Sequence, residues 1–543
     1  MVESQRVGHS THRRLPPGVT ACLLLLMLSA LALIAAPLAT AAASAAPSTA
    51  RGGDPLALLV LQQAELKDPL AATNDRFGVS VALSGDTALI GAYDKTVSGQ
   101  ADAGAVYVYT RSGATWSQQA ELKDPLAATN DAFGRSVALS GDTALIGAYG
   151  KTVSGQDGAG AAYVFVRTGR TWSQQAELTA SNAAANDEFG DSVALSGKTA
   201  LIGACSKTVS GQGEAGAAYV FVRTGTTWTQ QAELPDPDAA SDDQFGFSVT
   251  LAGDTAVVGA WQKTVGTVSV AGAAYVFVRS GTTWSRQAEL SDPDAANNDA
   301  FGSSVALSGD TALIGAWGKT VSGQTYAGAA YVFVRSGTTW SQQAELTASN
   351  AATDECFGSS VALAGDTALI GAWGKTVSGQ TDAGAAYICM RSGTTWSQQA
   401  QLNDPDAAAN DFFGWPLALC GDTVLLGANG KTVSGQADAG AAYVDVWAAP
   451  SLSLKAKAAS IKVGKSVTLS GLVKHFLGTG MTVQIERRVG KKLTVLETLT
   501  LTKSGAFTWT MKPKKAGKWV FEAACKSGGV SYSSKSVTVQ VHK

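Results

Sequence analysis

Short apolar runs, each closed by glycine, aspartate or serine, recur along most of this chain of 543 residues. In one stretch they fall at residues 79–83, 87–92, 105–110 and 116–122. These runs are rich in β-branched and aromatic residues, and no stretch repeats its apolar positions every 3.6 residues. The pattern therefore predicts four short β-strands joined by turns, and no helix.

This four-strand pattern repeats with a period of 56 residues. The dipeptide Phe-Gly recurs at that spacing and begins at Phe77, Phe133, Phe189, Phe245, Phe301, Phe357 and Phe413. Gly-Ala recurs in phase with it, from Gly91 in the first unit to Gly427 in the last. Seven units of four strands match the blades of a β-propeller.

The two ends of the array distinguish a closed propeller from an open solenoid. The seventh unit stops at Trp447 and lacks a fourth strand. The missing sequence precedes the first unit, where residues 61–66 match residues 117–122 one period later. Because an open array has no need of this permutation, we expect the N-terminal strand to complete the last blade and close the ring.

Residues 77–82, 91–92 and 104–109 resemble the FG-GAP repeat, which builds the seven-bladed propeller of integrin α-subunits and of many bacterial surface proteins. The resemblance covers residues 57–447 and implies an all-β, seven-bladed β-propeller. The calcium loop of that family, D-x-D-x-D-G, is replaced here by Ser84-Gly85-Asp86-Thr87. A single carboxylate cannot supply the six to eight oxygen ligands of Ca²⁺. We therefore expect no calcium at this turn, and no cofactor.

A second domain is predicted at residues 454–543, after a linker at 448–453. Residues 463–471 and 537–539 alternate like the strands of a β-sandwich. The segment resembles the Ig-like modules appended to bacterial surface proteins. It has no internal Cys–Trp–Cys pattern, so an antibody-type domain is not expected.

The N-terminus has the features of an export signal. Arg13 and Arg14 precede an apolar run at residues 19–36, and Ala41-Ala42-Ala43 fits a cleavage site. Residues 1–43 are therefore predicted to be a signal peptide and residues 44–56 a linker, which places the protein outside the cell or at its surface. The alternative is a retained membrane anchor, because the run is about long enough to span a bilayer.

Charge is divided unevenly along the chain. Residues 51–450 carry 21 Lys and Arg against 39 Asp and Glu, whereas residues 451–543 carry 17 against 3. The acidic propeller disfavours nucleic acid as a partner. The basic domain suits an anionic cell-wall polymer, and its densest cluster is Lys512, Lys514, Lys515 and Lys518.

The propeller lacks the residues of most catalytic and metal centres. The four histidines, at positions 9, 12, 475 and 542, all lie outside it, which excludes His-based catalysis and His-ligated zinc there. The cysteines Cys205, Cys356, Cys389 and Cys420 occupy different positions of the unit and are expected to be buried substitutions. The chain is predicted not to be an enzyme.

An acidic residue precedes every Phe-Gly by two positions, as Asp75 does in the first unit, and is expected to cap backbone N–H groups of the turn. Three inter-blade loops carry further carboxylates that are candidates for a divalent cation such as Ca²⁺. The candidate ligands are Asp236, Asp238, Asp243, Asp292, Asp294, Asp299, Asp404, Asp406 and Asp411. A solvated acidic loop is the alternative.

Aromatic residues follow Gly-Ala in five units, where the family has proline. They are Tyr93, Tyr149, Trp261, Trp317 and Trp373. Beside the long loops they are candidates to stack on sugars or anchor peptides, and packing between blades is the alternative. A lysine lies two residues further on in each unit, from Lys95 to Lys431, and is expected to be solvated.

These observations predict a secreted or cell-surface binding protein that presents a multivalent propeller face to extracellular glycan or protein ligands. Contact with a membrane is expected only through an uncleaved signal. One alternative is an enzyme that acts on extracellular polysaccharide through carboxylates. It would need one unit with a distinctive acidic pair, which the nearly identical units are interpreted not to have. The other is an architectural surface protein without a specific ligand.

Overall fold

The computed structural model describes residues 60–236, 238–447, 451–474, 482–489, 492–501, 506–527 and 530–543. Every regular element in these ranges is a β-strand. The predicted signal peptide at 1–43, the linker at 44–56 and residues 448–450 of the second linker lie outside the described residues. Within the described ranges, no helix has the length and apolar character needed to cross a bilayer.

The first unit forms one antiparallel sheet in the order β2-β3-β4-β5. Its strands are β2 (Ser80–Ser84), β3 (Thr87–Ala92), β4 (Ala105–Ser112) and β5 (Thr115–Leu122). Each strand predicted from the apolar pattern is present, with ends displaced by at most two residues. The four-stranded blade is therefore confirmed.

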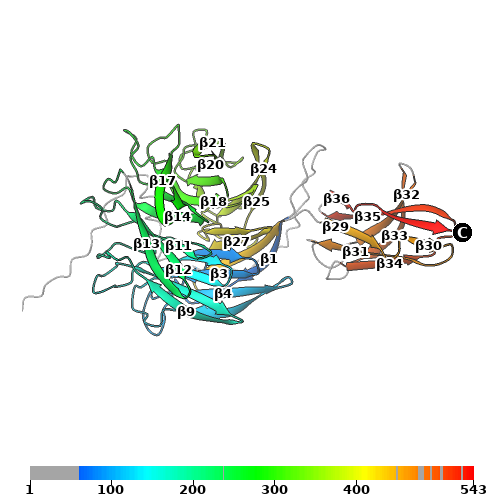
Figure 1. Ribbon diagram of the computed structural model, residues 1–543, viewed down its shortest axis with the longest axis horizontal. Coiled ribbons are helices and arrows are strands. Elements are labelled where there is room, and N and C mark those ends of the chain that lie inside the picture. The colour runs from blue at the N-terminus through cyan, green and yellow to red at the C-terminus, as the bar shows by residue number, and fades with distance from the viewer. Residues whose placement is uncertain are drawn as a thin grey trace, which may run out of the picture. The chain divides into compact units, whose positions relative to one another are not determined.

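Five further blades repeat this meander (Figure 1). Blades 2 and 3 contain β6 (Phe133–Ser140), β7 (Thr143–Ala148), β8 (Ala161–Thr168), β9 (Thr171–Leu178), β10 (Val193–Ser196), β11 (Thr199–Ala204), β12 (Ala217–Thr224) and β13 (Thr227–Pro235). Blades 4 and 5 contain β14 (Phe245–Ala252), β15 (Thr255–Ala260), β16 (Ala273–Ser280), β17 (Thr283–Leu290), β18 (Phe301–Ser308), β19 (Thr311–Ala316), β20 (Ala329–Ser336) and β21 (Thr339–Leu346). Blade 6 contains β22 (Phe357–Ala364), β23 (Thr367–Ala372), β24 (Ala385–Ser392) and β25 (Thr395–Leu402).

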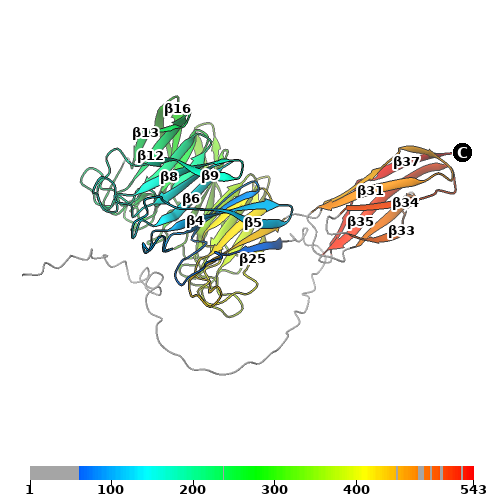
Figure 2. The same cartoon turned by 90° about the horizontal axis from the view of Figure 1, so that it is seen from below.

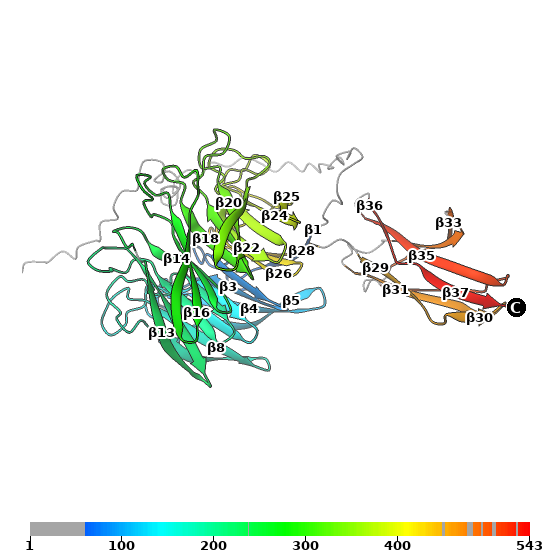
Figure 3. The same cartoon turned by 45° about the horizontal axis from the view of Figure 1, so that its top comes forward.

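Blade 7 is built from both ends of the repeat array. It joins β26 (Leu417–Cys420), β27 (Thr423–Ala428) and β28 (Ala441–Trp447) to the N-terminal strand β1 (Val60–Leu66). Figure 3 shows β1 beside β28, with which it pairs in antiparallel register. The first strand of every blade also contacts the first strands of both neighbours, including β26 with β2. The expected closure by the N-terminal strand is therefore confirmed, and the first strands are the innermost ones.

The Phe-Gly and Gly-Ala motifs form the junctions between blades. Phe77 is fully buried and packs on Tyr107 of its own blade at a ring distance of 5.3 Å. A Cβ on Gly91 would lie 2.1 Å from the carbonyl oxygen of Gly134 in the next blade, so only glycine permits this approach. Gly427 meets Gly78 in the same way at the junction that closes the ring.

Blade 7 differs from the other blades by a buried carboxyl group on its third strand, β28. Asp445 on β28 lies where blades 1 to 5 have Tyr or Phe, and it is 6% exposed. Its Oδ1 has no hydrogen-bond partner among the described residues. Burial, followed by the charge of Asp404, raises the pKa of Asp445 to about 7. The closing blade therefore contains a group that titrates near neutral pH.

We expect Asp445→Asn to stabilise the protein at pH 8 and to have little effect at pH 4. The folded-state pKa lies above the unfolded value, so the contribution of the protonated carboxyl is fully present below about pH 4 and lost as the pH rises through 7. At about 1.4 kcal/mol per pKa unit, the penalty at pH 8 reaches up to about 4 kcal/mol. Urea unfolding of the natural protein and of Asp445→Asn at pH 4 and pH 8 measures this penalty. The same change in the free energy of unfolding with pH in both proteins would contradict the prediction.

The C-terminal residues form two facing sheets around one core (Figures 1 and 2). One sheet contains β29 (Ser451–Ala456), β31 (Val467–Lys474) and β34 (Ala506–Met511). The other contains β30 (Ser460–Lys462), β37 (Val537–His542), β35 (Gly517–Ser527), β32 (Thr482–Val489) and β33 (Lys492–Thr500), and β36 (Val530–Ser533) pairs with β35. The domain is thus a β-sandwich that begins at Ser451, earlier than the predicted boundary at 454. Its Ig-like character stays a prediction.

Candidate functional site on the loop face

The propeller has two unlike faces. One carries the long connections between the second and third strands of a blade and between successive blades, and we call it the loop face. The other carries two-residue turns, such as those at Gly85 and Gly113, and we call it the turn face. All residues predicted as sites in the propeller belong to the loop face.

In six blades the aspartate two positions before Phe-Gly caps its turn as predicted, whereas Glu355 of blade 6 binds Lys375. The backbone N of Ala72 donates to Oδ2 of Asp75 at 2.8 Å, and that of Ala128 donates to Asp131 at 2.7 Å. The same carboxylates contact the lysine of the neighbouring loop. Nζ of Lys95 lies 2.9 Å from Oδ2 of Asp75. The conserved spacing along the unit is thus explained by a structural role.

The lysine of the second loop is part of the blade interior. In blade 4, Nζ of Lys263 donates to Oδ2 of Asp236 and of Asp243, both at 2.9 Å, and to the carbonyl oxygen of Asp238 at 3.1 Å. Lys263 is 7% exposed. Burial lowers its pKa, but the two carboxylates overcome this effect, so the net pKa is raised. The expectation that these lysines are solvated was wrong, because each is needed to neutralise buried carboxylates.

The structure does not assemble a cation site from the acidic loops. In each loop, two carboxylates converge on the lysine ammonium, which occupies the place between them, while the third carboxylate is exposed. The converging pairs are Asp236 and Asp243, Asp292 and Asp299, and Asp404 and Asp411. The exposed side chains are those of Asp238, Asp294 and Asp406. Within the described part of the chain, no group of three or more His, Cys, Asp or Glu is arranged to hold a metal.

The five predicted aromatic residues lie on the loop face close to the innermost strands. Trp261 is 9% exposed, and the other four are half-buried. Those other four are Tyr93, Tyr149, Trp317 and Trp373. Each of the five residues contacts side chains of its own blade or of a neighbouring blade. Four of them pack against these side chains and also keep part of their surface accessible.

Three further positions of the unit vary among blades that are otherwise nearly identical. In the first unit they are occupied by Arg76, Val79 and Asp102. From blade 1 to blade 7 the first position reads R, A, E, Q, A, C, F and the second reads V, R, D, F, S, S, W. The sequence interpretation missed these positions, although a comparison of the seven units column by column would have found them.

The variable positions converge around the axis of the propeller. The backbone N of Ala132 in blade 2 donates to the carbonyl oxygen of Asp102 in blade 1 at 2.9 Å, and the N of Arg135 donates to Ala132 at 3.1 Å. The first and second positions of one blade are thus joined to the third position of the preceding blade, and the aromatic position lies beside them. We call the residues at these four positions the variable ring.

Blades 4 and 5 contribute a continuous aromatic arc to the variable ring. The ring of Trp261 lies 5.5 Å from Phe247 and 6.2 Å from Trp317, and Trp317 stacks on Tyr326 at 5.9 Å. Nε1 of Trp261 donates to Oε1 of Gln244 at 2.7 Å. These contacts hold the aromatic rings in fixed orientations.

Blades 6 and 7 contribute a second aromatic arc. Trp373 stacks on Trp415 at 5.6 Å and meets Phe412 edge-on at 5.5 Å. Trp415 is 36% exposed, which makes it one of the few large apolar side chains accessible in the propeller. Asn429 occupies the position of blade 7 that holds an aromatic residue in five other blades. It is 4% exposed, and its Oδ1 has no hydrogen-bond partner among the described residues.

Blades 1 to 3 contribute charges instead. Nε of Arg135 lies 2.9 Å from Oδ1 of Asp191, and its guanidinium lies 5.8 Å from the ring centre of Tyr93 and 5.9 Å from that of Tyr149. The charge of Asp191 raises the pKa of Arg135 and burial lowers it, and the net pKa of Arg135 is raised. Burial raises the pKa of Tyr149 to about 12. The variable ring is therefore aromatic on one side and charged on the other.

Blade 3 contains the one acidic pair of the variable ring that has no equivalent in another blade. Glu188 accepts a hydrogen bond from Oγ of Ser206 at 2.7 Å, and Sγ of Cys205 lies 3.7 Å from Glu188 and 3.8 Å from Asp191. Burial, opposed by the Ser206 hydrogen bond, raises the pKa of Glu188. The sequence interpretation held that no unit carries a distinctive acidic pair, and this was wrong.

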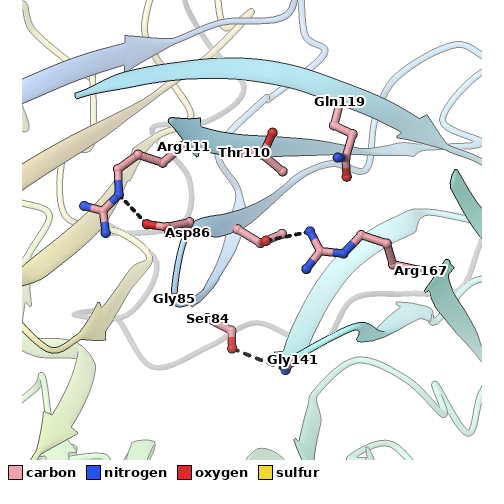
Figure 4. A pocket seen from close by; sticks show the side chains of 9 residues that line it. Ser84, Gly85, Asp86, Thr110, Arg111, Gln119, Gly141 and Arg167 are labelled. Carbon is pink, nitrogen blue, oxygen red and sulfur yellow. Dashed lines mark hydrogen bonds and ion pairs between the residues drawn. The ribbon is translucent and has the colours of Figure 1, made fainter. Parts of the chain in front are cut away.

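The turn face has an open polar pocket between blades 1 and 2 (Figure 4). Arg167 points to Thr87 of the preceding blade at 2.9 Å, and Nε of Arg111 lies 2.7 Å from Asp86. Arg111 also donates to Thr423 of blade 7 at 3.1 Å. The lining residues are thus repeat residues that join neighbouring blades, and the same arginine–threonine hydrogen bond recurs between other blades.

The fold and the variable ring define a closed repeat propeller with one specialised face. The chain belongs to the FG-GAP repeat family, whose model matches residues 60–109, 116–165, 172–221, 228–277, 284–333, 340–389 and 396–444. Each match begins in the outer strand of one blade and ends in the third strand of the next, so the sequence repeat straddles two blades. No curated protein matches the chain. Membership of this family indicates an interaction protein of the cell surface or extracellular space.

Proposed function

We propose that the protein is a secreted or cell-surface lectin-like protein that binds an extracellular glycan through the variable ring. The observation that carries the proposal is that nearly identical units differ at the four positions that converge on one face. A position that serves only the blade would be filled alike in all units, as Phe77 and Lys95 are. The differences between the units therefore support one binding site to which all the blades contribute different side chains.

The composition of the variable ring suits a saccharide. Sugars offer apolar C–H faces, which pack on flat aromatic rings such as Trp373 and Trp415, and hydroxyl groups, which bind to carboxylate, guanidinium and amide groups. The charged side of the variable ring, with Arg135 and Asp191, supplies such groups beside the aromatic arcs. Because the arcs differ from blade to blade, the proposal is one asymmetric site instead of the seven equivalent sites of a multivalent face.

A glycan-array screen of the full chain tests the proposal. We expect specific binding, and we expect Trp317→Ala/Trp373→Ala to weaken it by about 30-fold or more, since a buried Trp anchor contributes about 2 kcal/mol or more. Leu126→Ala is the matched control, because Leu126 is 78% exposed on the loop face outside the variable ring. Binding only to proteins, or equal losses in both variants with unchanged melting temperatures, would count against a glycan site.

Cleavage of the bound glycan is a second candidate function, favoured by the acidic pair of blade 3. Two carboxylates beside a bound sugar are the tools of glycoside hydrolysis, and the raised pKa of Glu188 suits a general acid. Asp191, however, is paired with Arg135. Release of reducing sugar that Glu188→Gln abolishes would establish an enzyme, whereas binding without release would support a protein that only binds.

A further inference from the structure

The sandwich gathers its positive charge at one end. The β30 strand pairs with the C-terminal half of β37, and Gly517 at the start of β35 pairs with Val541. β32 ends beside the start of β35, since Arg488 pairs with Val520. The loops after β30 and before β35, the end of β32 and the C-terminal residue therefore lie at the same end, which we call the basic tip. Ser451, where β29 begins, pairs with Lys474 at the opposite end.

Three segments far apart in sequence are fastened to one another at the basic tip. The backbone N of Gly464 donates to the carbonyl oxygen of Pro513 at 3.1 Å, and that of Val463 donates to His542 at 2.8 Å. Nε1 of Trp519 donates to the carbonyl oxygen of Lys515 at 3.3 Å. The lysines of these segments are thus carried on a fixed framework.

The basic tip is exposed and almost uncompensated. Lys512, Lys514, Lys515 and Lys518 are all exposed, and the structure adds Lys462, Lys465 and Lys543, which are exposed as well. The domain has only three acidic residues, and one of them, Glu522, is engaged by Arg488 at 2.6 Å and 2.8 Å. Arg487 lies over the ring of Trp519 at 3.6 Å. The lysines are therefore free to act on a partner in solution.

We propose that the basic tip binds a linear polyanion with phosphate groups along its backbone. The ammonium group of a lysine is a compact point charge. The lysines of the basic tip lie at the ends of several strands, which are about 4.8 Å apart in a sheet. A chain of successive phosphates can therefore contact several of these lysines at once. Four exposed apolar side chains also lie at or near this end: Val463 after β30, Val489 at the end of β32, and Leu493 and Val495 at the start of β33. Seven exposed lysines outnumber them, so the charge favours a polyanion, and the basic tip is independent of the site on the propeller.

Binding of the full chain to long-chain inorganic polyphosphate tests the proposal. We expect the logarithm of the binding constant to fall linearly with the logarithm of the salt concentration. Lys514→Gln/Lys515→Gln should reduce the slope by about 1 to 2, at about 0.7 to 0.9 per lost contact. The matched control is Lys455→Gln/Lys535→Gln, which removes the same charge from exposed lysines away from the basic tip and should leave the slope nearly unchanged.

Three results would overturn the proposal. The first is no binding to polyphosphate at low salt. The second is an equal loss of slope in the two double variants, which would mean that only the net charge of the domain matters. The third is binding confined to vesicles of phosphatidylglycerol and phosphatidylcholine, with Leu493→Ser and not Lys514→Gln/Lys515→Gln reducing it, which would assign the basic tip to a membrane surface.

Discussion

A chain that lacks β1 should melt about 10 °C or more below the full chain and should aggregate on heating. β1 supplies the outer strand of blade 7, where Leu66 is 4% exposed, and it accepts the Nε1 hydrogen bond of Trp116 through Gln63 at 2.9 Å. Burial of one leucine contributes about 1.5–3 kcal/mol, and each ladder hydrogen bond contributes about 1 kcal/mol. For a domain of this size, each kcal/mol shifts the melting temperature by about 1 °C, and the contributions of this seven-residue strand together reach about 8 to 10 kcal/mol.

The loss has a second cost, because removal of β1 exposes the edge of β28 to other chains. Calorimetry of the deletion variant, with light scattering recorded in parallel, measures both effects. A synthetic peptide of residues 57–66, added in excess, should restore most of the melting temperature, whereas the same peptide with Leu66→Pro should not. An unchanged melting curve in the deletion variant would contradict closure of the ring by this strand.

Replacement of Lys263 by Met should destabilise the propeller by about 3–5 kcal/mol near neutral pH. The substitution leaves Asp236 and Asp243 buried without the ammonium that lies 2.9 Å from both of them, and an uncompensated buried charge carries a penalty of this size. Lys207→Met in blade 3 is the matched control. Lys207 has one carboxylate partner, Asp187 at 2.8 Å, so we expect a smaller loss there.

The penalty of Lys263→Met should depend on pH. Burial already raises the pKa of Asp243, and Lys263 opposes this effect, so the variant should raise that pKa further. A folded pKa above the unfolded value means that stability is present below about pH 4 and is lost as the pH rises through the folded pKa. Urea unfolding should therefore show a larger difference from the natural protein at pH 8 than at pH 4.5. An equal difference at both values would show that the lysine acts through packing alone.

The architecture could be predicted from the sequence because each blade is a local structure. The 56-residue period, the turns and the alternation of apolar residues are all contained within one unit, and the match of residues 61–66 to residues 117–122 revealed the permuted strand. The strand registers and the junctions between blades repeat with the unit, so a correct prediction for one blade applies to all seven. This is why the predicted strands of the first blade differ from the observed ones only at their ends.

The site was harder to predict because it is made between units. Trp373 and Trp415 are neighbours although they belong to different positions of different blades, and no local pattern connects them. The prediction that the loop lysines are solvated was wrong for another reason. Lys263 lies in the loop that follows β15, and only the fold shows that its long side chain reaches the buried carboxylates of the preceding inter-blade loop. Burial of a charged side chain depends on its partners, which a single strand of sequence does not display.

The separation between junction and variable ring has a consequence for engineering. The contacts of Gly91 with Gly134, and of Gly427 with Gly78, fix the spacing of the blades through the backbone, and the ring positions add only backbone hydrogen bonds, such as that from N of Ala132 to O of Asp102, which do not involve their side chains. A combinatorial library could therefore randomise those positions in all seven blades while the Phe-Gly and Gly-Ala motifs stay constant. The molecule would then serve as a display scaffold in which affinity for a chosen target is selected without a new fold.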